Sequence, residues 1–229
     1  QQDRIRIFET GLAFTTVNGL QQEPRIAGLI GGSVTPENWS EKARNVDFYD
    51  VKGDVEALLG LSGGDLSYRF EKATLAALHP GQTAAILKDN EVVGYVGALH
   101  PELQKKLDIA SKIYLFELAL SGITRRSLPQ FKELSKYPEV RRDLALIVDE
   151  KISAQAILNF VRESAGALLT DLVLFDVYQG ANLEAGKKSI AFGMTLQDAT
   201  RTLQDEDINP VVERVVASLR EKFNVILRE

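Results

Sequence analysis

The chain has 229 residues, of which 45% are hydrophobic and 26% charged, a balance typical of a globular protein with a sizeable core. Its net charge is −5, shared as −2 over residues 1–131 and −3 over residues 132–229, so neither half has the positive excess of a general nucleic-acid binder. The absence of cysteine excludes disulfides and thiolate chemistry, and the lack of an apolar stretch of ~18 residues or a signal-peptide layout leads us to expect a cytoplasmic protein with no membrane partner.

The first half of the chain has the pattern of a sheet with a few helices. Short β-rich runs predict strands near residues 5–14, 25–30, 83–87, 92–99 and 113–118. Residues 47–59 predict a helix, because Val51, Val55 and Leu59 recur at helical spacing. A short helix is expected at residues 102–107, after Pro101. This half is therefore expected to be an antiparallel or mixed sheet with helices.

An irregular segment separates the two halves. Residues 121–142 contain Ser121-Gly122, Arg125-Arg126, Pro129 and Pro138, which interrupt regular structure. We place a first domain at residues 1–122, a linker at 123–134 and a second domain at 135–229.

The second half has a clearer pattern. Strands are predicted at residues 143–149, 172–178, 188–196 and 223–228. One helix is expected to begin after the capping residue Ser153 and to end at Gly166, and a longer one to begin near Asp205. The order βαββαβ is typical of ferredoxin-like folds. The chain as a whole is expected to be an α+β protein.

In this topology both helices cover one face of the sheet, so alternate strand residues divide into a helix-facing set and a set on the opposite face, called here the open face. The expected helix-facing set is apolar: Leu144, Leu146, Val148, Val173, Phe175, Val177, Ile190, Phe192, Met194, Leu196, Phe223, Val225 and Leu227. The expected open-face set is Asp143, Ala145, Ile147, Leu174, Asp176, Tyr178, Ser189, Ala191, Gly193, Asn224, Ile226 and Arg228.

The open face is expected to have small side chains in its middle and polar side chains around them. Ala145, Ala191 and Gly193 would form a flat floor, on which nucleic-acid bases can lie while Tyr178 stacks and Asp176 or Ser189 meets polar base edges. The alternative is a sheet face that is simply solvated or covered by a partner. An ordinary RNA-recognition motif is not favoured, because its stacking aromatics occupy strands that here carry alanine and glycine.

Other candidate signals indicate structural roles. His79 and His100 both occur in Leu-His-Pro, and with no cysteine and no carboxylate at ligand spacing we expect turn or capping roles and no metal site. Trp39, the only tryptophan, is expected to pack. No nucleophile or base cluster suggests a catalytic residue.

Several strings are similar to one known family, in order along the chain. In the first half they are residues 46–56 (VDFYDVKGDVE), 78–81 (LHPG), 93–101 (VGYVGALHP) and 116–118 (FEL). In the second half they are residues 136–138 (KYP), 141–145 (RRDLA), 175–180 (FDVYQG) and 188–189 (KS). Together they resemble the β subunit of bacterial phenylalanyl-tRNA synthetase, and they cover nearly the whole chain.

This resemblance implies a C-terminal part of that subunit. The first half would be a class II synthetase-like domain without catalytic residues, since neither a glycine-rich strand ending in arginine nor a motif-two arginine is found. The implied enzyme attaches phenylalanine to its tRNA and is an (αβ)2 assembly, so the implied partners are the catalytic α subunit, a second β subunit and tRNA(Phe). ATP and Mg²⁺ are implied for the complete enzyme, and no cofactor is implied for this chain.

The resemblance also implies RNA contacts for particular residues. By their positions in the matching motifs, five residues are implied to contact the anticodon as in the family: Ala145, Asp176, Tyr178, Ser189 and Arg228. All five belong to the expected open-face set. The alternative function is a free-standing ferredoxin-like regulatory or ligand-binding module. Such modules place glycine-rich contacts at a strand-to-helix turn, and residues 149–153 contain no glycine, which favours the synthetase interpretation.

Overall fold

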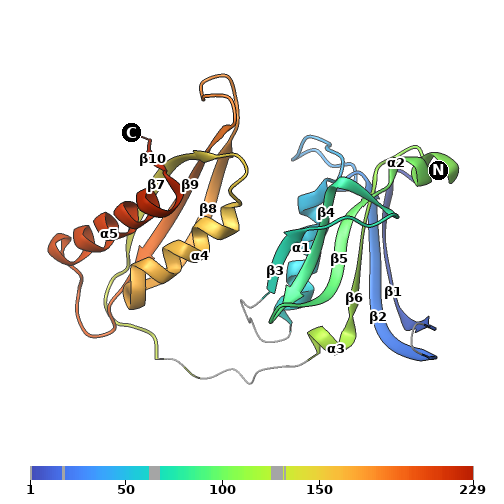
Figure 1. The fold of residues 1–229 in the computed structure, drawn as a ribbon, viewed down its shortest axis with the longest axis horizontal. Coiled ribbons are helices and arrows are strands. Elements are labelled where there is room, and N and C mark those ends of the chain that lie inside the picture. The colour runs from blue at the N-terminus through green and yellow to red at the C-terminus, as the bar shows by residue number, and fades with distance from the viewer. Residues whose placement is uncertain (1, 17–18, 62–67, 125–130, 132, 229) are drawn as a thin grey trace. The chain divides into compact units, whose positions relative to one another are not determined.

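The computed structural model describes residues 2–16, 19–61, 68–124, 131 and 133–228. The chain separates into two compact units, Gln1–Gln130 and Phe131–Glu229 (called units 1 and 2), each with its own sheet (Figure 1). The predicted linker, residues 123–134, lies for the most part outside the described residues, so its bounds stay a prediction.

Unit 1 is built on a six-stranded sheet with the order β1-β2-β6-β5-β4-β3. All of its strand pairs are antiparallel, so of the two expected kinds of sheet the structure has the antiparallel one. The strands are β1 (Arg4–Thr15), β2 (Gln21–Gly32), β3 (Tyr68–Lys72), β4 (Leu78–Lys88), β5 (Glu91–Leu99) and β6 (Ile113–Ala119). The helices are α1 (Phe48–Gly60), α2 (Pro101–Lys106) and α3 (Leu120–Ile123).

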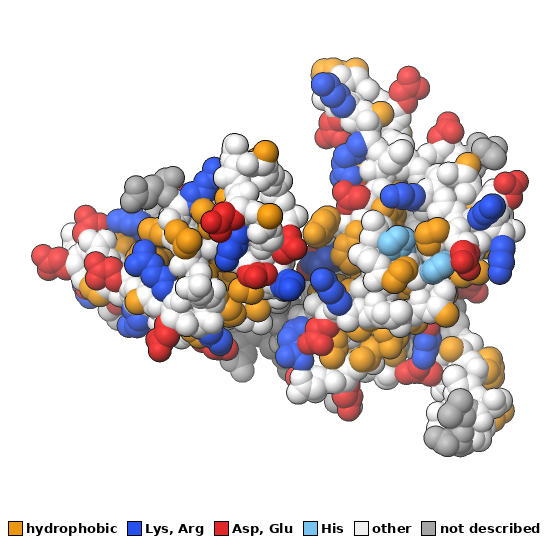
Figure 2. Space-filling model, turned by 45° about the horizontal axis from the view of Figure 1, so that its top comes forward, with side chains coloured by type: hydrophobic (Ala, Val, Ile, Leu, Met, Phe, Trp, Pro, Cys, Tyr) orange, Lys and Arg blue, Asp and Glu red, His pale blue; other side chains and the backbone are white. Residues whose placement is uncertain are grey.

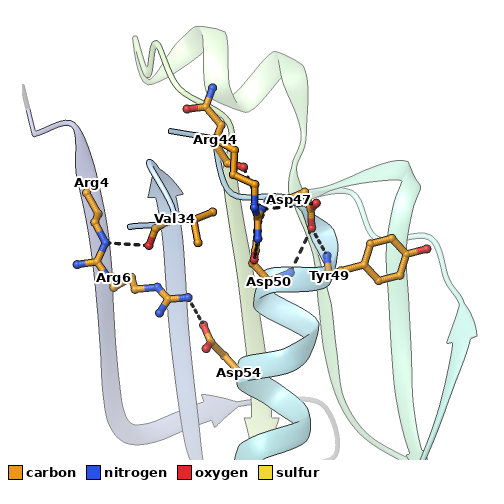
Figure 3. Close-up of polar contacts among 9 residues, drawn as sticks. Arg4, Arg6, Val34, Arg44, Asp47, Tyr49, Asp50 and Asp54 are labelled. Atoms are coloured by element: carbon orange, nitrogen blue, oxygen red, sulfur yellow. Dashed lines mark hydrogen bonds and ion pairs between the residues drawn. The ribbon is translucent and has the colours of Figure 1, made fainter. Parts of the chain in front are cut away.

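A reciprocal pair of side-chain caps starts helix α1 (Figure 3). The Asp47 carboxylate accepts hydrogen bonds from the backbone N–H groups of Tyr49 and Asp50, at 2.7 and 3.2 Å, and the Asp50 carboxylate accepts one from the N–H of Asp47 at 2.8 Å. Both terminal nitrogens of Arg44 donate to Asp50, at 2.8 and 2.7 Å, and these bonds hold the pKa of Asp50 below its ordinary value. Otherwise unpaired N–H groups at the helix start are thereby satisfied.

The apolar side of α1 forms the core of unit 1. Val51, Val55 and Leu59 are buried and pack against sheet residues that include Ile30 and Phe116. The helix is also tied to β1, where Arg6 forms an ion pair with Asp54 at 3.3 Å (Figure 3). One face of the six-stranded sheet is thus covered by α1 over part of its width.

Unit 2 has a four-stranded sheet with the order β10-β7-β9-β8, in which all pairs are antiparallel. Its elements in chain order are β7 (Val140–Asp149), α4 (Ala154–Ala165), the 3-10 turn η1 (Gly166–Leu168), β8 (Leu169–Tyr178), β9 (Lys187–Leu196), α5 (Asp205–Phe223) and β10 (Ile226–Leu227). Numbered within the unit, the strand order is 4-1-3-2, which confirms the ferredoxin-like prediction.

The two long helices of unit 2 cover the same face of this sheet (Figure 1). The hydroxyl of Ser153 caps α4 by accepting a hydrogen bond from the N–H of Ala156 at 3.1 Å, and Gly166 ends the helix with a φ of 75°. The buried residues of α5 lie at helical spacing: Ile208, Val211, Val215 and Leu219. They share one core with β7 and β9, so the opposite face of the sheet is left uncovered by helices.

The last strand is shorter than the sequence suggests. Phe223 ends helix α5, with its ring edge-on to that of Phe160 at 5.5 Å, and Asn224 follows as the helix cap with a left-handed φ of 51°. The predicted strand 223–228 is therefore reduced to Ile226–Leu227, and Phe223 and Asn224 do not belong to the sheet. The apolar run hides the boundary, because asparagine is tolerated in the left-handed conformation that ends a helix.

Limited proteolysis tests the division of the chain. Because contacts cluster within each unit, we expect the first cuts between residues 121 and 136, releasing a stable C-terminal piece of roughly 90–100 residues. Mass spectrometry of a time course would locate the cuts. Early cleavage inside β7, β8, β9 or the helices that cover them would contradict the division.

Candidate nucleic-acid interface

Strand register brings four of the predicted site residues into two neighbouring rows on the open face. Across β7, β9 and β8 the first row is Ala145, Ala191 and Asp176. The next row places Ser189 beside Tyr178. Residues paired in this way point to the same side of a sheet, so Ala145, Asp176, Tyr178 and Ser189 share the open face.

Arg228 joins them from the end of β10. Its backbone N–H donates to the carbonyl of Ala145 at 2.8 Å, and its guanidinium donates to the hydroxyl of Ser189 at 3.4 Å. The same guanidinium stands 5.9 Å from the centre of the Tyr178 ring, within range of a cation–π contact. The structure therefore brings together all five predicted residues.

The side chains of these residues differ in their exposure to solvent. Ser189 is only 2% exposed, so its hydroxyl contributes mainly by holding Arg228. Tyr178 is half-buried, whereas Asp176 is exposed. Among the described residues, the Asp176 carboxylate accepts no hydrogen bond and has no ion-pair partner, which leaves both oxygens available to a donor.

The first part of β8 has the opposite register to the predicted one. Leu174 pairs with the buried Phe192 and faces the helices, whereas Val173 pairs with Gly193 on the open face and is 43% exposed. Phe175 is 50% exposed. The expected sides of Val173, Leu174 and Phe175 are therefore wrong.

A β-bulge between Leu174 and Asp176 explains this difference. The bulge inserts Phe175 as an extra residue opposite Ala191, so alternation restarts at Asp176. Beyond it the predicted sides of Asp176 and Tyr178 are confirmed, and Val177 lies opposite the buried Ile190 as predicted, although it is 49% exposed.

Sequence reasoning missed one exposed aromatic group and its partner. The guanidinium carbon of Arg141, on β7, stands 5.5 Å from the centre of the Phe175 ring. Arg141 also donates through Nε to the Asp143 carboxylate at 2.8 Å. The run Leu172–Phe175 has no polar position, so periodicity alone could not decide which of its residues face the core.

The two histidines have the structural roles predicted for them. Nδ1 of His79 accepts a hydrogen bond from the N–H of Gly81 at 3.0 Å, and Nδ1 of His100 caps α2 by accepting one from the N–H of Glu102 at 3.2 Å. Both histidine side chains are visible at the surface in Figure 2. Trp39 is 98% exposed, so the expectation that it packs was wrong for this chain.

Comparison with known families identifies both units. The family model described as the phenylalanyl-tRNA synthetase beta chain CLM domain matches residues 1–120, and that of the ferredoxin-fold anticodon binding domain matches residues 135–228. The chain belongs to the phenylalanyl-tRNA synthetase β-chain family. This finding supports the synthetase interpretation over that of a free-standing regulatory module.

Curated relatives from several bacteria agree with the family models. The phenylalanine–tRNA ligase β subunits of Pseudomonas putida and Methylococcus capsulatus are each 50% identical over the whole chain, and that of Colwellia psychrerythraea is 46% identical. In each case the match covers 29% of the relative. The chain thus spans about three tenths of the length of the β subunits that it resembles.

The corrected register of β8 predicts a stability contrast between two phenylalanines. Phe192→Ala should destabilise unit 2 by about 3–5 kcal/mol, because Phe192 is fully buried. Phe175→Ala should cost less than about 1 kcal/mol, because half of Phe175 is exposed and its loss leaves no internal cavity. Urea unfolding followed by circular dichroism would measure both. Equal losses of unfolding free energy in the two variants would show that Phe175 belongs to the core, against the corrected register.

Proposed function

We propose that the open face of unit 2 binds the anticodon stem-loop of tRNA(Phe), and that the chain serves a phenylalanine–tRNA ligase as a non-catalytic part of its β subunit. The observation that supports this proposal most directly is the convergence of five side chains from β7, β8, β9 and the end of β10 on one exposed surface. They are Ala145, Asp176, Tyr178, Ser189 and Arg228.

The chemistry of this surface suits single-stranded bases. Ala145 and Ala191 keep the middle of the sheet low, which allows a flat base to approach the strands. The Tyr178 ring supplies a stacking surface, and Arg228 is held beside it by Ser189. A tRNA anticodon offers such bases at the end of a loop.

Asp176 is the residue best suited to reading base identity. Its carboxylate can only accept hydrogen bonds, so it would select the amino or imino groups of a base. A negative group beside RNA also repels phosphates, and a specific hydrogen bond has to offset this cost. Its exposed position without a partner among the described residues fits such a role.

The charge of the chain implies that binding depends on local geometry and on partners. Acidic and basic side chains are interspersed over the face drawn in Figure 2, in keeping with the net charge of −5. Arg228 supplies a positive charge at the site, and Arg141 supplies another farther along the same face. We propose that the α subunit, together with a second β subunit, shares the phosphate contacts of the tRNA.

Unit 1 offers an apolar surface for protein partners. Three apolar residues of β1 that share the α1 side of the sheet remain exposed: Phe8 at 75%, Leu12 at 53% and Phe14 at 61%. Exposed apolar groups in such a cluster commonly mark protein–protein contacts. This surface supports the proposed role of unit 1 in holding the catalytic α subunit.

The proposed division of labour places the chemistry outside this chain. ATP and Mg²⁺ are assigned to the complete enzyme because the family resemblance implies them there. Within the described ranges, no three His, Cys, Asp or Glu side chains form a group that could hold a metal ion. We propose the cytoplasm as the site of action, where aminoacyl-tRNA is used. No helix in the described part of the chain is long and apolar enough to cross a membrane.

The non-catalytic role predicts that the purified chain does not activate phenylalanine. Phenylalanine-dependent exchange of pyrophosphate into ATP should stay at the background level of a reaction without protein, because the chain lacks the glycine-rich strand and arginines that class II catalysis needs. Addition of the α subunit and the remainder of the β subunit should restore exchange. Exchange by the chain alone would overturn this part of the proposal.

Two substitutions on β8 test the RNA-binding proposal. Tyr178→Ala should weaken binding of the anticodon stem-loop by about 1–3 kcal/mol, through loss of base stacking, for cognate and altered anticodons alike. Asp176→Asn keeps the size of the side chain but adds a donor, so it should narrow the difference in affinity between the cognate and altered anticodons. Fluorescence titration with labelled stem-loops of both kinds would measure these effects.

Neither substitution should unfold unit 2, because both side chains lie on the open face. Thermal melts of each variant provide the control for folding. Val177→Ala is a matched control on the same strand, since Val177 is exposed on the helix side, and it should bind like the wild type. Wild-type binding by both Tyr178→Ala and Asp176→Asn would show that the open face is not the RNA site.

A further inference from the structure

The open face carries two arginine–aromatic pairs that repeat one arrangement. In the first, Arg228 reaches from the β10 side of the sheet to Tyr178 on β8. In the second, Arg141 reaches from β7, across β9, to Phe175 on β8. The low row of Ala145 and Ala191 lies between the row of Tyr178 and Ser189 and Gly193, beside which the Arg141 guanidinium lies. Arg228 and Tyr178 of the first pair are among the residues predicted to contact RNA, whereas Arg141 and Phe175 of the second pair are not.

The Arg141 side chain is held close to the sheet by its surroundings. A Cβ atom at Gly193, on β9, would come within 2.6 and 2.7 Å of the Nε and one terminal nitrogen of Arg141, so the guanidinium occupies the space that a side chain would need. Asp143 fixes Nε by a hydrogen bond of 2.8 Å. A glycine beneath and a carboxylate beside it thus keep the guanidinium close to the sheet.

The outer part of this group remains available. The Arg141 side chain is 54% exposed, and among the described residues its terminal amino groups donate to no partner. The Phe175 ring beside it is half exposed. Because the bulge places Phe175 next to Asp176 opposite Ala191, the aromatic ring lies beside the carboxylate that is proposed to read a base.

We infer that Arg141 and Phe175 form a second nucleotide platform on the open face, which takes an RNA base next to the one held at Tyr178. This inference rests on the proposed function. Bases of single-stranded RNA stack on aromatic rings and on arginine planes, and the exposed terminal N–H groups can also meet a phosphate. Tyr178 and the bulge lie opposite β9 residues two apart, so the platforms are separated by about 7 Å along the strands. That separation exceeds a single stacking step and suits neighbouring bases that are splayed apart.

The experiment compares binding of the anticodon stem-loop by variants of the complete chain. Phe175→Leu, Arg141→Gln and Arg141→Lys should each raise Kd about fivefold or more, because each removes one flat member of the platform. Arg141→Lys is informative, since lysine keeps the charge but has no plane for stacking. Gly193→Ala should also raise Kd, because its methyl group would occupy the space in which the Arg141 guanidinium lies.

Matched controls use neighbours that point to the helix side. Arg142 adjoins Arg141 but pairs with Asp205 at 2.8 Å, so Arg142→Gln should leave Kd within about twofold of the wild type. Val177→Ala, which removes exposed apolar surface from the same strand as Phe175, should do the same. Thermal melts and circular dichroism verify that each variant is folded.

The outcomes separate this inference from the function on which it rests. If Tyr178→Ala weakens binding while the Phe175 and Arg141 variants bind like the wild type, the second platform is overturned and the proposed function stands. Two further results would show that Arg141 acts only as a positive charge, and would also overturn the platform. One is wild-type affinity of Arg141→Lys for the stem-loop, and the other is a loss of affinity in Arg142→Gln equal to that in Arg141→Gln. If Tyr178→Ala, Asp176→Asn and the platform variants all bind normally, both proposals fail.

Discussion

Burial of one side of strand β9 is the constraint on which the proposed interface depends. Ile190, Phe192, Met194 and Leu196 are all fully buried under α4 and α5, so the strand cannot slip by one residue without exposing all four. The other side of β9 is then determined as Ser189, Ala191 and Gly193. Each of these has a definite place: the serine holds Arg228, the alanine forms the floor, and the glycine receives Arg141. The core of unit 2 thus positions side chains that are themselves outside it.

The bulge in β8 shows how one extra residue changes what a surface can do. In a regular strand Asp176 and Phe175 would point to opposite sides of the sheet. With the bulge, both are opposite Ala191 and both are exposed, so a carboxylate and an aromatic ring become neighbours. Regular pairing on either side of the bulge keeps Leu174 and Val177 in helix-facing register. The local irregularity therefore adds a functional group to the open face and leaves the core layer in place.

The sequence predicted the parts of this fold where burial imposes a period, and it failed where several conformations satisfy the same pattern. Helix α5 and the strict alternation of β9 combine apolar and polar positions, and their burial follows from spacing alone. The run Leu172–Phe175 is apolar throughout, so it permits either register. The end of α5 depends on the left-handed conformation of Asn224, which neither the period nor the composition reveals.

For the candidate site, the predicted side of the sheet was confirmed where motif position and alternation agreed, whereas the RNA contacts stay a prediction. Asp176 and Tyr178 were assigned to the open face on both grounds, and the structure places them there. Arg141 and Phe175 were not recognised, because their contact spans three strands and depends on a glycine between them. Such a contact depends on long-range pairing, which a linear pattern does not contain. The exposure of Trp39 was likewise missed, since a single large aromatic residue carries no period.

The shortness of β10 has a consequence for how binding and local order are coupled. Arg228 is attached to the sheet through a strand with only two paired residues, together with one hydrogen bond to the carbonyl of Ala145. Such a strand opens at a lower free-energy cost than the interior strands, so the guanidinium is in place for only as long as the strand is docked. A ligand that grips Arg228 binds the docked form alone and shifts this equilibrium by mass action. Under the proposed function, RNA affinity and amide protection of this edge strand are therefore two readouts of one equilibrium.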